Sequence, residues 1–218
     1  MGDLRKLELE DISDLRAYER ERPDLQKRVS DVKRLRRVAL GPIMSVVFEN
    51  VLTVRYQIQE MARVEKLATD DQIREELRVY NPLIPDPGEL SATLFLELTD
   101  DASLREWSPK LVGIERALLI RLGSSAGAGN GESAGTDISA GAGGGDEVRS
   151  LPEQSHAEQL TREDVTASVH YIRFPFSPAQ VELFASGPVV LASDHPAYKV
   201  ECELPEETRQ ELVEDLRA

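Results

Sequence analysis

A run of small residues interrupts the middle of this 218-residue chain and limits what can fold around it. Residues 124–147 read SSAGAGNGESAGTDISAGAGGGDE, and 17 of these 24 residues are Gly, Ala or Ser. Such a segment buries too little apolar surface to offset the conformational entropy that it loses on ordering. We therefore expect a single domain over residues 1–218, interrupted by a disordered, flexible insertion at 124–147.

Hydrophobic periodicity predicts helices and strands mixed on both sides of this insertion. Pro23 is expected to end one helix and open the next, because proline fits the first turn of a helix but not its interior. Helices are expected at 12–22, 23–38, 55–67, 70–80, 177–187 and 205–218, and strands at 43–54, 90–99, 113–123, 169–174, 188–193 and 197–204.

The order of these elements has no strict strand–helix–strand repeat, which favours an α+β fold. We expect N-terminal helices packed on a largely antiparallel sheet, with a C-terminal helix closing the chain. Hydrophobic residues make up 40% of the sequence, which is enough for a core.

Composition and charge argue against several classes of protein. The net charge is −14, which disfavours nucleic-acid binding because phosphate contacts need an excess of Lys and Arg. A single cysteine, Cys202, excludes a disulfide framework within one chain and a cysteine-rich zinc site. The sequence contains no membrane-spanning apolar run and no apolar signal region in MGDLRKLELED, so we expect a soluble cytoplasmic protein.

The densest basic run is KRLRR, residues 33–37. It could hold a phosphate or an acidic partner, but on a helix its charges spread around much of the circumference. We favour a solvated face, or a contact with the acidic later part of this chain, over nucleic-acid binding.

Two polar side chains, Gln57 and Glu60, fall among the apolar residues of the helix expected at 55–67. At about 100° per residue, Val64 lies in the same apolar arc, whereas Gln59 lies on the opposite, solvated side. A carboxylate facing the core is costly unless it is paired. We favour a structural ion pair with an arginine of KRLRR or with Arg116, and the alternative is that Gln57 and Glu60 line a pocket.

Histidines offer the other candidate site. His170 lies in a predicted strand and is interpreted as a satisfied core or edge histidine, whereas His195 lies in the predicted turn DHP. If both imidazoles met Glu60, the three side chains could bind iron or zinc, although no spacing in the sequence requires it. The sequence has no G-x-S-x-G, P-loop, H-E-x-x-H or C-x-x-C motif.

Five segments together resemble a bacterial family of unknown function of about this chain's length: FENVLTVRYQIQEMARVEK, EELRVYNPLIPDPGELSATLFLEL, VHYIRFPFS, DHPAY and ETRQELVEDL. The resemblance covers nearly the whole chain except the insertion. It implies a genomic context, since members are often encoded beside rubrerythrin-like and iron–sulfur oxidoreductase proteins. It implies no catalytic residues, because the family has no established activity.

The leading hypothesis is a cytoplasmic binding or accessory protein that works with a redox or oxidative-stress partner of the rubrerythrin-like or iron–sulfur oxidoreductase type. Its ligand-binding residues would be Gln57, Glu60, Glu89 of the DPGEL loop, His170 and His195. The alternative is a small metal-dependent enzyme that uses His170, His195 and Glu60. The sequence leaves the ligand, any cofactor and the oligomeric state open.

Overall fold

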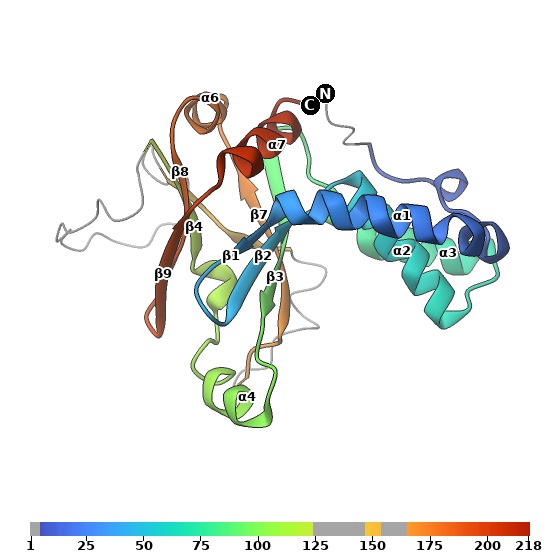
Figure 1. The fold of residues 1–218 in the computed structure, drawn as a ribbon, viewed down its shortest axis with the longest axis horizontal. Helices are drawn as coiled ribbons and strands as arrows, with labels where there is room; N and C mark the ends of the chain where they lie inside the picture. Colours follow the sequence, from blue (N-terminus) through green and yellow to red (C-terminus); the bar gives the residue numbers. More distant parts are fainter. Residues whose placement is uncertain (1–4, 124–146, 154–164) are drawn as a thin grey trace.

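The computed structural model describes residues 5–123, 147–153 and 165–218 and builds a layer of helices against two β-sheets (Figure 1). The α-helices in these ranges are α1 (Leu15–Arg36), α2 (Val51–Glu65), α3 (Asp70–Tyr80), α4 (Asp101–Trp107), α6 (Pro178–Ser186) and α7 (Glu206–Leu216). Short 3-10 helices are η1 (Leu9–Asp11), η2 (Asn81–Leu83) and η3 (Ile114–Arg116). The insertion predicted at 124–147 lies outside the described residues except for Glu147, which begins β5.

Every strand pair in the two sheets is antiparallel. The first sheet has the order β1-β2-β3-β7-β6 and the second has β5-β4-β8-β9. Their bounds are β1 (Arg37–Ala39), β2 (Met44–Phe48), β3 (Glu89–Leu96), β4 (Leu118–Leu122), β5 (Glu147–Arg149), β6 (Leu151–Pro152), β7 (Val169–Pro175), β8 (Val189–His195) and β9 (Tyr198–Glu203).

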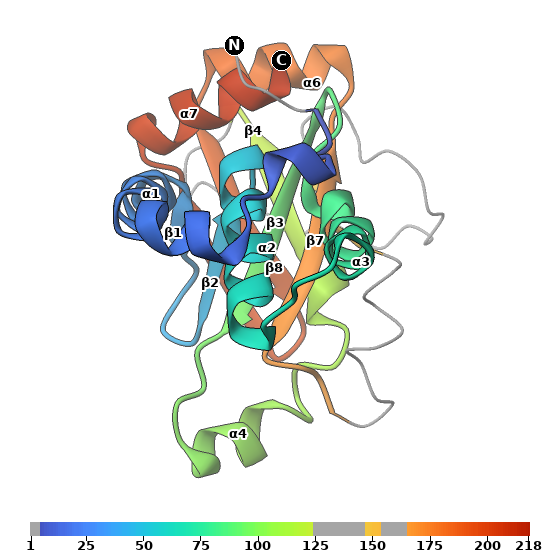
Figure 2. The same cartoon turned by 90° about the vertical axis from the view of Figure 1, so that its right-hand side faces the viewer.

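The main core lies between the two sheets. Side chains alternate along each strand, so Phe48, Leu94 and Phe174 of the first sheet belong to one buried cluster with Ile120 and Leu191 of the second. Helices α1, α2 and α3 cover the other face of the first sheet (Figure 2). The predicted α+β fold with a largely antiparallel sheet is therefore confirmed.

The end of β2 and the start of α2 differ from the prediction of a strand over 43–54. The strand ends at Phe48, and α2 begins at Val51. Asn50 caps the helix, because its Oδ1 accepts from the N–H of Thr53 while Thr53 Oγ1 accepts from the N–H of Asn50. This reciprocal cap outweighs the strand propensity of the β-branched residues that follow it.

Helix α1 runs without a break through Pro23, so the prediction of two helices separated at this residue is wrong. Tyr18, Leu25 and Val29 are buried on the same side of the helix, before and after the proline. Continuous burial of this stripe offsets the backbone hydrogen bond that the proline removes. The proline itself is exposed.

Two further expectations need correction. The strand expected at 113–123 starts only at Leu118, because Gly113 at φ 88° opens the 3-10 turn η3. In α2, Gln59 is fully buried whereas Val64 is 62% exposed, so the predicted apolar arc was rotated on the helix. The side-chain amide of Gln59 is satisfied by backbone groups of Ser13, which makes its burial tolerable.

No helix among the described residues combines the length and the apolar character needed to cross a lipid bilayer.

Pro23 gives a direct test of this account of α1. Pro23→Ala should raise the free energy of unfolding by about 1–3 kcal/mol, because alanine restores an interior N–H donor and is the best helix former. Pro178 stands at the first position of α6, where that N–H has no helical partner, so Pro178→Ala should give no comparable gain. Urea denaturation measures both changes, and equal effects would contradict the interpretation.

Candidate functional site

Arg36, at the C-terminal end of α1, is the largest fully buried side chain of the described residues, with 1% of its surface exposed. Its Nε donates to Oε1 of Glu211 at 3.1 Å, and its Nη1 donates to the backbone carbonyl of Glu49 at 3.3 Å. Its Nη2 lies 2.7 Å from Oδ2 of Asp215. One guanidinium group therefore joins α1, α7 and the turn before α2.

The carboxylates around this guanidinium exceed it in charge. Glu211 and Asp215 contribute two formal negative charges against one positive charge. Burial raises the pKa of Asp215, and the guanidinium of Arg36 opposes that shift. Oδ2 of Asp215 is in ion-pair range of Arg36 and has almost no exposed surface. The Arg36–Asp215 pair is therefore closed to solvent.

A cavity of about 490 Å³ opens beside this cluster. Its walls come from four parts of the chain: the end of α1, the first residues of α2, the last turns of α7, and the segment before α1. The lining residues are Arg5, Leu7, Glu10, Asp11, Arg36, Asn50, Val51, Leu52, Arg55, Glu211, Glu214 and Asp215. We refer to it as the Arg36 cavity.

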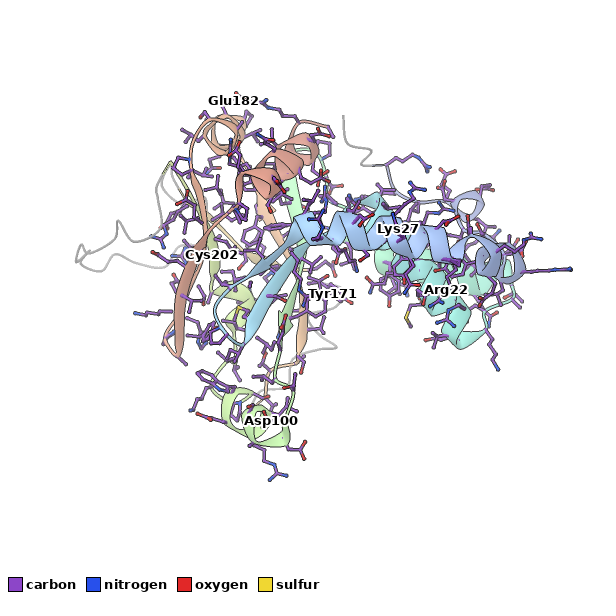
Figure 3. The ribbon with its side chains drawn as sticks, in the orientation of Figure 1. Arg22, Lys27, Asp100, Tyr171, Glu182 and Cys202 are labelled. Carbon is purple, nitrogen blue, oxygen red and sulfur yellow. The ribbon has the colours of Figure 1, made fainter. Side chains whose placement is uncertain are left out.

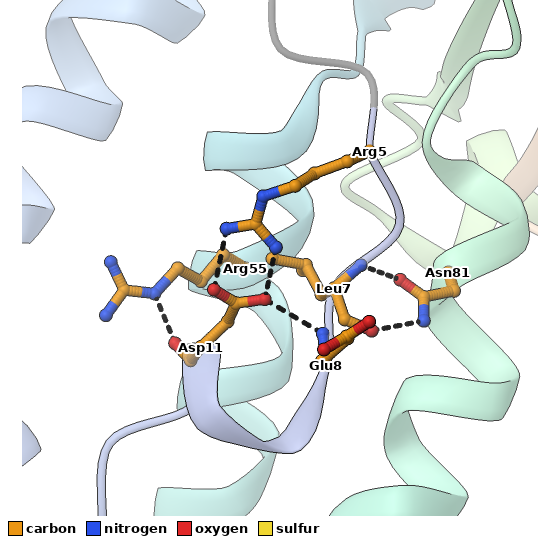
Figure 4. A network of polar contacts seen from close by, with 6 residues as sticks. All are labelled: Arg5, Leu7, Glu8, Asp11, Arg55 and Asn81. Carbon is orange, nitrogen blue, oxygen red and sulfur yellow. Dashed lines mark hydrogen bonds and ion pairs between the residues drawn. The ribbon is translucent and has the colours of Figure 1, made fainter.

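The segment before α1, residues 5–14, lies across α2 and α3 and is called the N-terminal strap below. The side-chain amide of Asn81 contacts both backbone groups of Leu7, accepting from its N–H at 2.8 Å and donating to its carbonyl at 2.9 Å (Figure 4). Arg55 Nε donates to the carbonyl of Asp11 at 2.7 Å. These contacts are directed at backbone, so they fix the path of the strap beside the cavity.

Inside the strap, Arg5 and Asp11 form a two-point ion pair at 2.6 and 2.7 Å (Figure 4). The guanidinium of Arg5 and the backbone N–H of Glu8 lower the pKa of Asp11 to about 2. The strap therefore brings a stable carboxylate and its counter-charge to one wall of the Arg36 cavity.

Glu60 lies elsewhere, on the side of α2 that faces α1. Arg22 and Arg63 both donate to its carboxylate, at 2.7–3.0 and 3.0–3.2 Å, and the hydroxyl of Tyr18 donates at 2.6 Å. Figure 3 shows Arg22 on the outer part of the helical layer, away from the strand that carries Tyr171. The favoured structural ion pair is present, but the predicted partners, an arginine of KRLRR or Arg116, were wrong.

Gln57 and Glu89 occupy two further places. Nε2 of Gln57 lies 3.4 Å from the hydroxyl of Tyr171, between α2 and β7. Glu89, at the start of β3, pairs with Nη1 of Arg173 at 2.6 Å. Burial raises the pKa of Glu89, and the guanidinium of Arg173 opposes the shift. Neither residue lines the Arg36 cavity.

The two histidines are buried and bonded on different sheets. Nε2 of His170, on β7, lies 2.9 Å from the carbonyl of Ala167, and its Nδ1 lies 3.9 Å from the carboxylate of Glu115. Burial lowers the pKa of His170. His195 ends β8 rather than standing in a turn; its Nδ1 accepts from the N–H of Ala197, so its Nε2 donates to the carbonyl of Val112 at 3.1 Å.

Glu60 on α2, His170 on β7 and His195 on β8 are each bonded to different partners. Within residues 5–123, 147–153 and 165–218, no group of three or more His, Cys, Asp or Glu side chains is placed to hold a metal ion. The three-ligand metal site stays a prediction that this geometry does not favour.

The Arg36 cavity was not identified from the sequence, although one signal pointed to it. The expected contact between KRLRR and the acidic later part of the chain is confirmed at Arg36, which pairs with Glu211 and Asp215. Arg34 and Arg37 of the same run are exposed. Sequence alone could not show that Asn50 and the strap would lie beside this pair.

The ion pairs of Glu60 should make the free energy of unfolding fall at acid pH. Its pKa is lowered from 4.5 to about 2, first by hydrogen bonds from Arg22, then by those from Arg63 and Tyr18. A lowered folded-state pKa stabilises the protein above the unfolded value and loses that effect as the pH falls toward 2. Glu60→Gln should therefore flatten the decline in unfolding free energy between about pH 5 and 2. Glu65→Gln, an exposed change on the same helix, should not, and identical slopes in acid urea titrations would refute the assignment.

Comparison with other proteins agrees with the resemblance seen in the sequence. A family model described as "Protein of unknown function (DUF3501)" matches residues 6–140 and 141–216. The crystal structure of a novel protein of unknown function from Burkholderia pseudomallei K96243 is similar, with a TM-score of 0.80 and 29% identity over 97% of this chain and 100% of that chain. A search of the curated proteins finds no match. This chain therefore belongs to the DUF3501 family of proteins of unknown function.

Proposed function

We propose that the protein is a cytoplasmic binding or accessory protein that works with a redox or oxidative-stress partner, and that the Arg36 cavity is its ligand site. The observation that carries the binding role is the cavity itself. Its volume of about 490 Å³ falls within the usual range of small-molecule sites.

The construction of the cavity supports this role. Arg36 holds two walls in place through Glu211, Asp215 and the carbonyl of Glu49. Asn81 and Arg55 fix the strap that forms another wall. A site whose side chains are already held in position loses less conformational entropy when a ligand binds.

Two of the residues considered for metal chemistry already have structural partners. Glu60 is committed to Arg22 and Arg63, and His195 is bonded to backbone groups at both ring nitrogens. Such contacts are typical of side chains that stabilise a fold. The redox partner is inferred from the genomic context that the family resemblance implies.

Native mass spectrometry with elemental analysis on untagged protein from its own host tests the proposal. We expect the 24.3 kDa chain to carry a second polypeptide or a bound small molecule, without stoichiometric iron or zinc. The identity of a co-purified polypeptide then tests the redox association. One iron or zinc per chain in the absence of any partner would contradict the proposal and favour the metal-dependent enzyme.

A further inference from the structure

The Arg36 cavity has two walls of opposite electrostatic character. One wall is the last part of α7, which contributes Glu211, Glu214 and Asp215. The other wall is the N-terminal end of α2, which contributes Val51, Leu52 and Arg55. A ligand in the cavity would therefore meet carboxylates on one side and positive groups on the other.

The α2 wall offers unused hydrogen-bond donors. Asn50 accepts from the N–H of Thr53, and its carbonyl accepts from the N–H of Val54. The N–H groups of Val51 and Leu52 have no acceptor within the described part of the chain. They stand at the positive end of a 15-residue helix dipole. An anionic group at this wall would be stabilised by both effects.

Arg55 adds a positive charge to the same wall. Its Nε is engaged with the carbonyl of Asp11, whereas its Nη2 is no closer than 3.8 Å to the carboxylate of Glu21. The outer nitrogens of this guanidinium are therefore only weakly paired. They can contact a carboxylate without breaking the bond that holds the strap.

The α7 wall offers hydrogen-bond acceptors, in contrast to the donors of the α2 wall. Asp215 is 4% exposed and its Oδ2 lies 2.7 Å from Nη2 of Arg36, so this carboxylate is committed to the ion pair. Glu211 already shares Nε of Arg36, and Glu214 is exposed with no ion pair within the described residues. A cationic donor would find accessible acceptors on Glu211 and Glu214.

The net charge of the residues that line the cavity distinguishes between anionic, cationic and zwitterionic ligands. Five carboxylates and three guanidinium groups line the cavity, which gives a formal charge of −2. This excess disfavours a simple anion, whereas the α2 N-terminus disfavours a simple cation at its own wall. A molecule with both charges satisfies both walls.

We infer that the Arg36 cavity binds a small zwitterion of the amino-acid or short-peptide class, with its ammonium group against Glu211 and Glu214 and its carboxylate against Val51, Leu52 and Arg55. This inference rests on the proposed function, since it names the ligand class of the same cavity.

Dialanine and two blocked analogues test each wall separately. L-alanyl-L-alanine carries both charges, its N-acetyl form lacks the ammonium group, and its amide form lacks the carboxylate. Titration of the full chain, followed by backbone amide NMR shifts, should show dialanine perturbing the amides of Val51 and Leu52. Each analogue should bind at least about tenfold more weakly, because one charged contact is lost.

Variants on α7 supply a matched pair. Glu214→Gln should weaken dialanine binding several-fold and leave the N-acetyl analogue unaffected, because that analogue has no ammonium group. Glu207→Gln makes the same change at an exposed position of α7 that does not line the cavity, and it should bind like the parent protein. Thermal unfolding of both variants confirms that they are folded.

If the N-acetyl form binds as tightly as dialanine, the assignment of the ammonium group to the α7 wall is wrong. If the amide form does so, the assignment of the carboxylate to the α2 wall is wrong. No binding of dialanine up to tens of millimolar would overturn the inference as a whole. The proposed function is judged separately, because a second polypeptide or another bound small molecule found by native mass spectrometry would leave the accessory role standing.

Discussion

The guanidinium group of Arg36 determines how the helical layer meets the rest of the protein. It is buried at the end of α1, yet its three contacts lie on α7 and on the turn that leads into α2. Burying an arginine is favourable only when its donors are matched by well-placed acceptors. Because the match here comes from segments separated by 175 residues along the sequence, the contact fixes the tertiary arrangement and not only a local turn.

The Arg36 cavity is a consequence of this contact. With α1 and α7 held by one ion-pair cluster, the capped N-terminus of α2 is left beside α7, and the strap closes a third side. Backbone-directed contacts from Asn81 and Arg55 place the strap, and the buried side chain of Leu7 packs it against α2 and α3. Acidic and positive walls therefore face one cavity as a consequence of packing, which is the basis for assigning it a ligand with two charges.

The sequence predicted the fold class and most helices and strands, because hydrophobic periodicity and residue propensities act over short stretches of the chain. It failed where tertiary contacts decide the outcome. Pro23 was expected to end a helix, but the stripe of Tyr18, Leu25 and Val29 is buried across it. Gln59 was placed on the solvated side, but Ser13 satisfies its amide in a buried position. The KRLRR run predicted a contact with acidic residues, whereas the cavity depends on segments too far apart in sequence for any pattern to join them.

The most direct test of the account is a double-mutant cycle between Arg36 and Asp215, measured by urea denaturation. Arg36→Met alone should cost about 3–5 kcal/mol, because it leaves two carboxylates beside an apolar chain. Asp215→Leu in the same protein should restore part of that loss, with a coupling energy of about 1–3 kcal/mol. Arg34→Met, at an exposed position of the same run, should change stability by no more than about 0.5 kcal/mol. If Arg36→Met costs no more than Arg34→Met, the Arg36 cluster does not organise this fold.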